Sequence, residues 1–172
     1  GYERAGGVET HGAGSGSVTQ IGAVSPPGGD FSEPVTRHTK DIIETFWALS
    51  KELADARHYP SIDWVTSFSG HVHTAAEWWH QEISRDWERR RTEALALLAR
   101  DAELSRIVNL VGPEALSSAQ RWKLEGAALI KEGVLQQSAL DEVDTFCSPR
   151  KQFSLLDLVI FIFKQGATLI EL

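Results

Sequence analysis

The sequence predicts an α+β chain that is mainly α, in which residues 1–69 form the edge of an α/β domain and residues 70–172 form a helical bundle. Three observations predict this division. Nine of the 14 glycines fall in the first 30 residues, two stretches before residue 69 have strand composition, and apolar residues recur at helical spacing after residue 70. Residues 1–69 contain too few predicted strands to close a sheet, so we expect this domain to need further chain.

The first 34 residues predict a helix end, a strand and a loop. Residues 1–5 (GYERA) fit the last turn of a helix that Gly6-Gly7 would end. Residues 11–16 (HGAGSG) predict a flexible turn, and residues 17–24 (SVTQIGAV) alternate and are β-branched, which predicts a strand. Residues 25–34 (SPPGGDFSEP) predict an irregular loop. The chain contains no methionine, so we expect that a longer sequence precedes it.

Residues 39–56 are open to two interpretations. They fit one amphipathic helix, but residues 45–49 (TFWAL) have strand composition. We therefore expect a short helix, a buried strand and then a second helix through Leu53. The dipeptides Tyr59-Pro60 and Asp63-Trp64 predict an irregular aromatic connection after that helix.

The remaining sequence predicts a series of helices with recognisable ends. Apolar spacing predicts helices over residues 73–82 and 86–111, and Gly112-Pro113 ends the second of them. A serine at position 117 or 118 caps the next helix, which runs to about residue 135. Ser148-Pro149 places a capping serine directly before a first-turn proline, so the last helix begins there.

Composition excludes several classes of partner. A net charge of −7 opposes binding to nucleic acid or to an anionic membrane surface, because both require a positive footprint. The most apolar run, residues 153–163, is about half the length of a membrane-spanning helix and contains Asp157, so we expect a buried helix. The single cysteine, Cys147, cannot form an intrachain disulfide and is expected to be a buried structural thiol.

Two polar clusters invite functional interpretations that we do not adopt. His71 and His73, with Glu77 and His80, have residue types that suit zinc, but no H-E-x-x-H motif is present and no metal site is expected. The run of arginines at residues 89–91 lies among acidic residues, which is typical of a solvated helix face.

Several motifs resemble the catalytic A subunit of V-type and A-type rotary ATPases. The most specific is GSVTQIGAVSPPGGDFSEPVT at residues 16–36, and FWAL at residues 46–49 and RHYPSIDW at residues 57–64 follow it in order. Further matches are IVNLVG at residues 107–112 and LQQ with DTFCS between residues 135 and 148. The resemblance implies that residues 1–69 are the C-terminal edge of a RecA-like nucleotide-binding domain and that residues 70–172 are a C-terminal helical bundle.

The same resemblance implies that the full catalytic polypeptide is about three times as long as this chain. Its other part would hold the phosphate-binding P-loop, the carboxylate that activates water and the magnesium-handling residues. The motif G-x-x-x-x-G-K-[ST] does not occur in this chain. Since phosphoryl transfer depends on those groups, we expect no catalytic residue here and no ATP hydrolysis by the chain alone, although the intact subunit would be an enzyme.

The resemblance also implies a nucleotide-binding role for three residues. Tyr59, which precedes Pro60, would pack on the adenine ring, and Phe146 would form a second wall. Leu140 stands where the family usually has phenylalanine, which weakens that wall. ATP or ADP with Mg would bind the intact subunit, but these side chains alone would bind nucleotide only weakly, because stacking contributes about 1–3 kcal/mol per base.

Partners follow from the resemblance as well. The loop at residues 26–34 would contact the B subunit in an alternating hexamer, and the turn from Pro113 to Gln120 would contact the central stalk. The chain would be cytoplasmic and would meet a membrane only through the complex. Two alternatives are a helical interaction module with no nucleotide role and a related hexameric motor such as a flagellar export or termination-factor ATPase. The loop SPPGGDFSEPVT argues against the second alternative.

Overall fold

The computed structural model describes residues 5–12 and 14–170. The chain divides into two units, Gly1–Phe46 and Trp47–Leu172, which are described separately below. The domain boundary after residue 69 stays a prediction.

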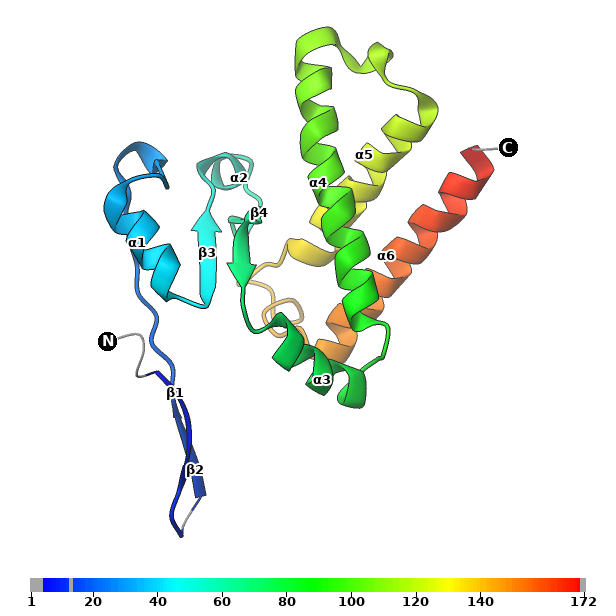
Figure 1. Ribbon diagram of the computed structural model, residues 1–172. Coiled ribbons are helices and arrows are strands. Elements are labelled where there is room, and N and C mark those ends of the chain that lie inside the picture. The colour runs from blue at the N-terminus through cyan, green and yellow to red at the C-terminus, as the bar shows by residue number, and fades with distance from the viewer. Residues whose placement is uncertain (1–4, 13, 171–172) are drawn as a thin grey trace. The chain divides into compact units, whose positions relative to one another are not determined.

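The first unit begins with an antiparallel hairpin of strand β1, Gly6–Thr10, and strand β2, Gly14–Val18 (Figure 1). Gly6 and Gly7 open β1, and the helix end predicted before them lies, apart from Ala5, outside the described residues. The strand predicted at residues 17–24 begins earlier and ends at Val18, because pairing with β1 determines its length and residues 19–26 have no partner strand among the described residues.

A loop and a capped helix follow the hairpin. The loop is irregular, as predicted, except for a 3₁₀ turn at Pro27–Gly29. Helix α1, Pro34–Ile42, begins before the predicted position at residue 39. Its start is determined by Glu33, whose side chain accepts a hydrogen bond from Thr36 N at 3.0 Å, and by the proline in the first turn.

A two-stranded sheet comes next, formed by strand β3, Thr45–Leu49, and strand β4, Ile62–Ser69, with helix α2, Lys51–Asp55, between them. The predicted strand at residues 45–49 is confirmed, but it is not a buried strand, because Ala48 alone in it is buried. The irregular connection predicted through Asp63-Trp64 is wrong. These residues belong to β4, which pairs with β3, and Ala48 N also donates to Ser67 Oγ at 3.0 Å.

The helical series is confirmed. Helix α3 spans Val72–Glu82, α4 spans Trp87–Val111, α5 spans Ser118–Ile130 and continues into a π-helical turn at Lys131–Leu135, and α6 spans Pro149–Ile170. A 3₁₀ turn at Pro113–Ala115 joins α4 to α5, and Gly112 adopts a φ of 89° at the end of α4. Ser117 makes a capping box with Gln120, and Ser148 Oγ accepts from Lys151 N at 3.2 Å.

The hydrophobic core lies where α4, α5 and α6 pack together (Figure 1). Trp64 from β4 also packs against this core. The buried residues that form it are Ala94, Leu97, Leu98, Ala127, Ile130, Val159 and Ile160. The core therefore joins one strand of the sheet to all three long helices of the second unit.

Helix α6 is apolar over much of its exposed surface. Within residues 153–163, only Val159 and Ile160 are buried, so the expected buried helix is half exposed instead. The helix is long and apolar enough to cross a membrane, with a mean hydropathy of 1.7, a test that core helices also pass. Two ion pairs nevertheless join it to α4: Arg90 Nε to Asp157 Oδ1 and Lys164 Nζ to Glu93 Oε1, both at 2.6 Å.

Candidate functional site

The short loop between α2 and β4 carries Tyr59, the first predicted nucleotide contact. Tyr59 precedes a cis proline, and its side chain is about half exposed, at 52%. The hydroxyl donates to Ala54 O at 3.4 Å, and the Tyr59 carbonyl accepts a hydrogen bond from Gln137 N at 2.8 Å. The backbone is thus fixed from the bundle side, while part of the ring stays accessible to a ligand.

The other two predicted contacts lie on the segment between the π-helical turn and α6. Leu140 is 98% exposed and Phe146 is 84% exposed. Internal hydrogen bonds shape this segment, including Ser138 N to Asp144 Oδ2 at 2.6 Å. The hydrogen bond from Gln137 N to Tyr59 O brings the start of the segment to Tyr59. Among the described residues, however, the rings of Tyr59 and Phe146 make no aromatic contact with each other. The two rings therefore do not form a closed slot in this structure.

A cluster next to Tyr59 escaped the sequence interpretation. His58 is buried, at 9% exposed, and meets the ring of Trp64 edge-on, with 5.6 Å between ring centroids. The ammonium of Lys131 lies 5.7 Å from the centre of the Trp64 ring and donates to Asp101 Oδ2 at 2.5 Å. No sequence signal could have found this cluster, because its members come from four separate elements.

His58 is held neutral by its surroundings. Burial lowers the pKa of His58, the positive charge of Lys131 lowers it further, and Glu132 opposes both effects. Its Nε2 atom is buried and has no hydrogen-bond partner, so the doubly protonated, charged ring would have an unpaired N–H donor there. His58 is therefore a packing group at neutral pH and a poor proton carrier.

Acidification is expected to destabilise the chain through His58. The folded-state pKa lies below the unfolded value of about 6.5, so the neutral imidazole contributes stability above that value, and this stability is lost as pH falls through the folded-state pKa. Urea unfolding at a series of pH values from 8 down to 5 should show the loss. In His58→Gln the fall should be smaller, with both proteins compared at pH 8 to subtract the change in packing. Identical pH profiles would contradict the assignment.

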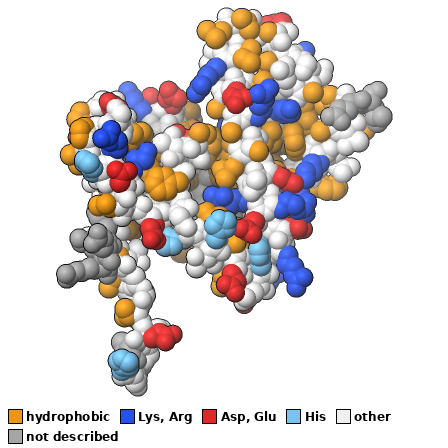
Figure 2. Space-filling model, in the orientation of Figure 1, with side chains coloured by type: hydrophobic (Ala, Val, Ile, Leu, Met, Phe, Trp, Pro, Cys, Tyr) orange, Lys and Arg blue, Asp and Glu red, His pale blue; other side chains and the backbone are white. Residues whose placement is uncertain are grey.

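The tip of the α4–α5 hairpin presents apolar side chains to solvent. Leu110 is 83% exposed, Val111 is 65% exposed and Ile107 is 40% exposed, and hydrophobic side chains are visible around this end of α4 in Figure 2. Leu116, at 3% exposed, anchors the turn, and its carbonyl accepts from Arg121 Nε at 3.2 Å. The tip therefore presents exposed apolar side chains next to a turn that Leu116 anchors.

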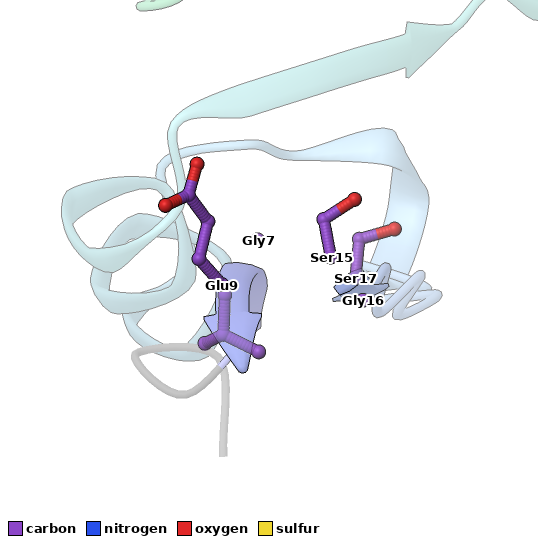
Figure 3. Close-up of a pocket in the computed structure, with 6 residues that line it drawn as sticks. Gly7, Glu9, Ser15, Gly16 and Ser17 are labelled. Atoms are coloured by element: carbon purple, nitrogen blue, oxygen red, sulfur yellow. The ribbon is translucent and has the colours of Figure 1, made fainter. Parts of the chain in front are cut away.

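One surface depression lies on the β1–β2 hairpin and has a volume of about 450 Å³. Glu9 stands on one strand, and Ser15 and Ser17 stand on the other (Figure 3). All three residues are exposed, so the hairpin offers no enclosed space for a ligand.

Another depression, of about 480 Å³, lies among the end of β4, α3 and α4. Here His73 Nδ1 lies 3.6 Å from Glu88 Oε1, and His80 Nε2 lies 3.3 Å from Glu88 Oε2. Glu77 instead accepts from Gln81 on the solvent side. In the described part of the chain, no group of three or more histidine, cysteine or acidic residues has a geometry that holds a metal ion.

Two family models together match nearly the whole chain. Residues 76–171 match the family described as the C-terminal domain of V and A type ATP synthase. Residues 2–69 match the nucleotide-binding domain of the ATP synthase alpha/beta family.

Individual relatives show the same likeness. The V-type ATP synthase alpha chain of Nitrosococcus oceani is 66% identical over 170 residues, which are 99% of this chain and 29% of that protein. The A-type ATP synthase A subunit of Ignicoccus hospitalis is 49% identical over 172 residues, again 99% of this chain and 29% of the relative. An ATP synthase subunit, NeqB from Nanoarcheaum equitans, is similar in structure, with a TM-score of 0.74, 25% identity, and coverage of 94% of this chain and 37% of that one. This chain thus covers 29% of the length of each of the two curated relatives and 37% of the NeqB chain.

Proposed function

Because this chain belongs to the V- and A-type ATP synthase family, in the C-terminal part of its catalytic A subunit, we propose that it supplies one wall of an adenine site and a lever to a rotary ATPase. The assembled enzyme would couple ATP hydrolysis or synthesis to movement of protons or sodium ions across a membrane. The observation that supports this best is the half-exposed ring of Tyr59, held by Gln137 and Ala54 in a segment that matches a nucleotide-binding family.

The proposed nucleotide is ATP or ADP with Mg. Tyr59 would stack on the adenine, and the phosphates and the metal ion would be held by the P-loop part of the assembled subunit. Stacking contributes about 1–3 kcal/mol per base, whereas even millimolar binding needs about 4.1 kcal/mol. The chain by itself should therefore bind nucleotide weakly and should not hydrolyse it.

Phe146 and Leu140 would complete the adenine wall when the nucleotide is present. Both side chains are almost fully exposed, on a segment whose start is bonded to Tyr59. A side chain so exposed gains apolar contact if a flat base lies against it, at about 25 cal/mol for each Å² removed from water. Phe146 would supply more of this contact than Leu140, since an aromatic ring matches the face of a base.

Two protein partners are proposed. The apolar tip at Ile107, Leu110 and Val111, next to the turn from Pro113 to Gln120, would contact the central stalk. Its two helices pack as one body, so a push at the tip would move the whole hairpin. The loop at residues 26–34 would contact the B subunit in an alternating hexamer. The complex would be cytoplasmic and peripheral to the membrane.

A hybrid subunit tests the nucleotide role. In it, this chain replaces the matching C-terminal region of the Nitrosococcus oceani V-type ATP synthase alpha chain, with which it shares 66% identity. The hybrid should assemble and hydrolyse ATP. Tyr59→Ala in the hybrid should raise KM for ATP by about 5- to 150-fold, the equivalent of 1–3 kcal/mol of lost stacking. Steady-state ATPase kinetics measure this change.

Matched variants make the test specific. Tyr59→Phe keeps the ring and loses only the 3.4 Å bond to Ala54, so its KM should stay near that of the unmodified hybrid. Leu140→Phe should lower KM, because it adds an aromatic side chain to the proposed wall. If Tyr59→Ala leaves KM unchanged in an active hybrid, the adenine role is wrong, and a helical interaction module remains the better description.

A further inference from the structure

The ammonium of Lys131 lies where three elements meet. It donates to Asp101 Oδ2 at 2.5 Å, and Asp101 is buried in the middle of α4, at 9% exposed. The same ammonium lies 5.7 Å from the centre of the Trp64 ring on β4. A cation this close to the face of an indole ring is attracted by the ring quadrupole. Lys131 therefore ties the end of α5 to α4 and to β4 at once.

Two routes lead from Lys131 to Tyr59. Through side chains, the Trp64 ring contacts His58 edge-on, and His58 directly precedes Tyr59. Through the backbone, Lys131 O accepts from Gln136 N at 2.8 Å and closes the π-helical turn, and the next amide, Gln137 N, donates to Tyr59 O at 2.8 Å. Lys131 is thus linked to the Tyr59 loop by both routes, in addition to the hydrogen bonds from His58 N to Leu53 O and from the Tyr59 hydroxyl to Ala54 O.

The electrostatic balance explains why this one side chain matters. The carboxylate of Asp101 is 12% exposed and has Lys131 as its ion-pair partner. Removing the ammonium would leave a buried charge without compensation, which a folded protein relieves by admitting water or shifting its backbone. The backbone that carries Lys131 is the π-helical turn, a kind of turn that often lies at functional sites.

We infer that Lys131 is a positioning residue for Tyr59: its contacts with Asp101 and Trp64 hold the Tyr59 loop in one place relative to α4. The inference rests on the proposed adenine role of Tyr59 for its functional meaning, but its structural half is independent of that role. Helix α4 continues from Asp101 to the exposed tip at Leu110 and Val111. The contacts of Lys131 therefore connect the proposed stalk-binding tip with the proposed adenine contact at Tyr59.

Hydrogen exchange in the purified chain tests the structural half. Lys131→Met should raise the exchange rate of the Gln137 amide by about tenfold or more, and the α6 core amides of Val159 and Ile160 should keep their rates. Lys123→Met, the same change at an exposed position of α5, should leave the Gln137 rate unaltered. Lys131→Arg keeps the charge and should restore slow exchange.

Two results would overturn the structural half: an unchanged Gln137 rate, or equal acceleration at Gln137, Val159 and Ile160, which would mean general destabilisation. If Lys131→Met does not fold, the double variant Lys131→Gln with Asp101→Asn takes its place. In this pair the amide of Gln and the amide of Asn can hydrogen-bond without charge, so Gln137 exchange should stay slow if the charge on Asp101 is what shifts the backbone; fast exchange in the folded double variant would mean that the ammonium itself, over the Trp64 ring, holds the loop.

Kinetics of the hybrid subunit test the functional half. Lys131→Met should raise KM for ATP by about tenfold with a much smaller change in kcat, because binding rather than chemistry is disturbed. If Tyr59→Ala raises KM and Lys131→Met does not, the inference about Lys131 is wrong and the proposed function stands. If neither Tyr59→Ala nor Lys131→Met changes KM, the proposed adenine role of Tyr59 is wrong. The hydrogen-exchange result then decides by itself whether Lys131 positions the Tyr59 loop.

Discussion

Replacing Ile160 with alanine is expected to destabilise the chain by about 2–5 kcal/mol, the usual cost of truncating a fully buried aliphatic side chain. Ile160 is 1% exposed and belongs to the cluster in which α6 packs on α4 and α5. Truncation removes apolar contacts and leaves a cavity that rigid helices cannot fill. Urea unfolding followed by circular dichroism measures the change in the free energy of unfolding.

Ile162 provides the matched control on the same helix. It is 43% exposed, so Ile162→Ala should cost less than about 1 kcal/mol. The contrast also distinguishes a helix packed on α4 and α5 from a helix surrounded by lipid. In lipid both isoleucines would be buried, and the ion pairs Arg90–Asp157 and Glu93–Lys164 would not hold the helix. Equal costs at the two positions would contradict the packing of α6 described here.

Replacing Gly166 with alanine should also destabilise the chain, although alanine favours helices. A Cβ atom on Gly166 would overlap the ring of Trp122, and that ring cannot swing away freely, because its Nε1 donates to Phe163 O at 2.8 Å. Overpacking of this kind costs about 1–3 kcal/mol, and loss of the hydrogen bond adds about 1 kcal/mol. The gain in helix propensity, about 1 kcal/mol, does not offset both.

Gly133→Ala is the control for helix propensity. A Cβ atom there would lie 3.8 Å from Val159 Cγ2, which is ordinary contact, so this variant should be as stable as the parent or slightly more stable. Thermal unfolding of the two variants side by side measures the difference. If both alanine variants gain stability, the close approach of α5 and α6 at Trp122 and Gly166 is wrong.

The close approach of α5 and α6 is reciprocal, which the sequence did not indicate. Gly126 on α5 accepts the Phe163 ring from α6, and Gly166 on α6 accepts the Trp122 ring from α5. The two rings stack with centroids 6.1 Å apart. A glycine inside a helix ordinarily costs about 1 kcal/mol relative to alanine. Its benefit appears only when the neighbouring helix is in place.

The candidate site was predictable only in part. The resemblance pointed to Tyr59, Phe146 and Leu140. In the structure Tyr59 O accepts a hydrogen bond from Gln137 N, at the start of the segment that carries the other two residues. It does not bring the rings of Tyr59 and Phe146 together among the described residues, so their shared role in binding stays a prediction. The distance between the two rings would depend on whether a nucleotide lies between them, and the identity of the residues alone does not predict that distance.

The sequence by itself determined the family, through its motifs, and the helical half of the chain, through its apolar spacing. It also determined the ends of these helices, because caps such as Ser117 and Ser148 and stops such as Gly112 act within a few residues of themselves. Tertiary structure alone decided that residues 62–69 form a strand, that hairpin pairing ends β2 at Val18, and that Lys131 meets Asp101 and Trp64. Strand pairing and buried ion pairs join residues far apart in the chain, so their energy depends on which segments meet and not on local preference.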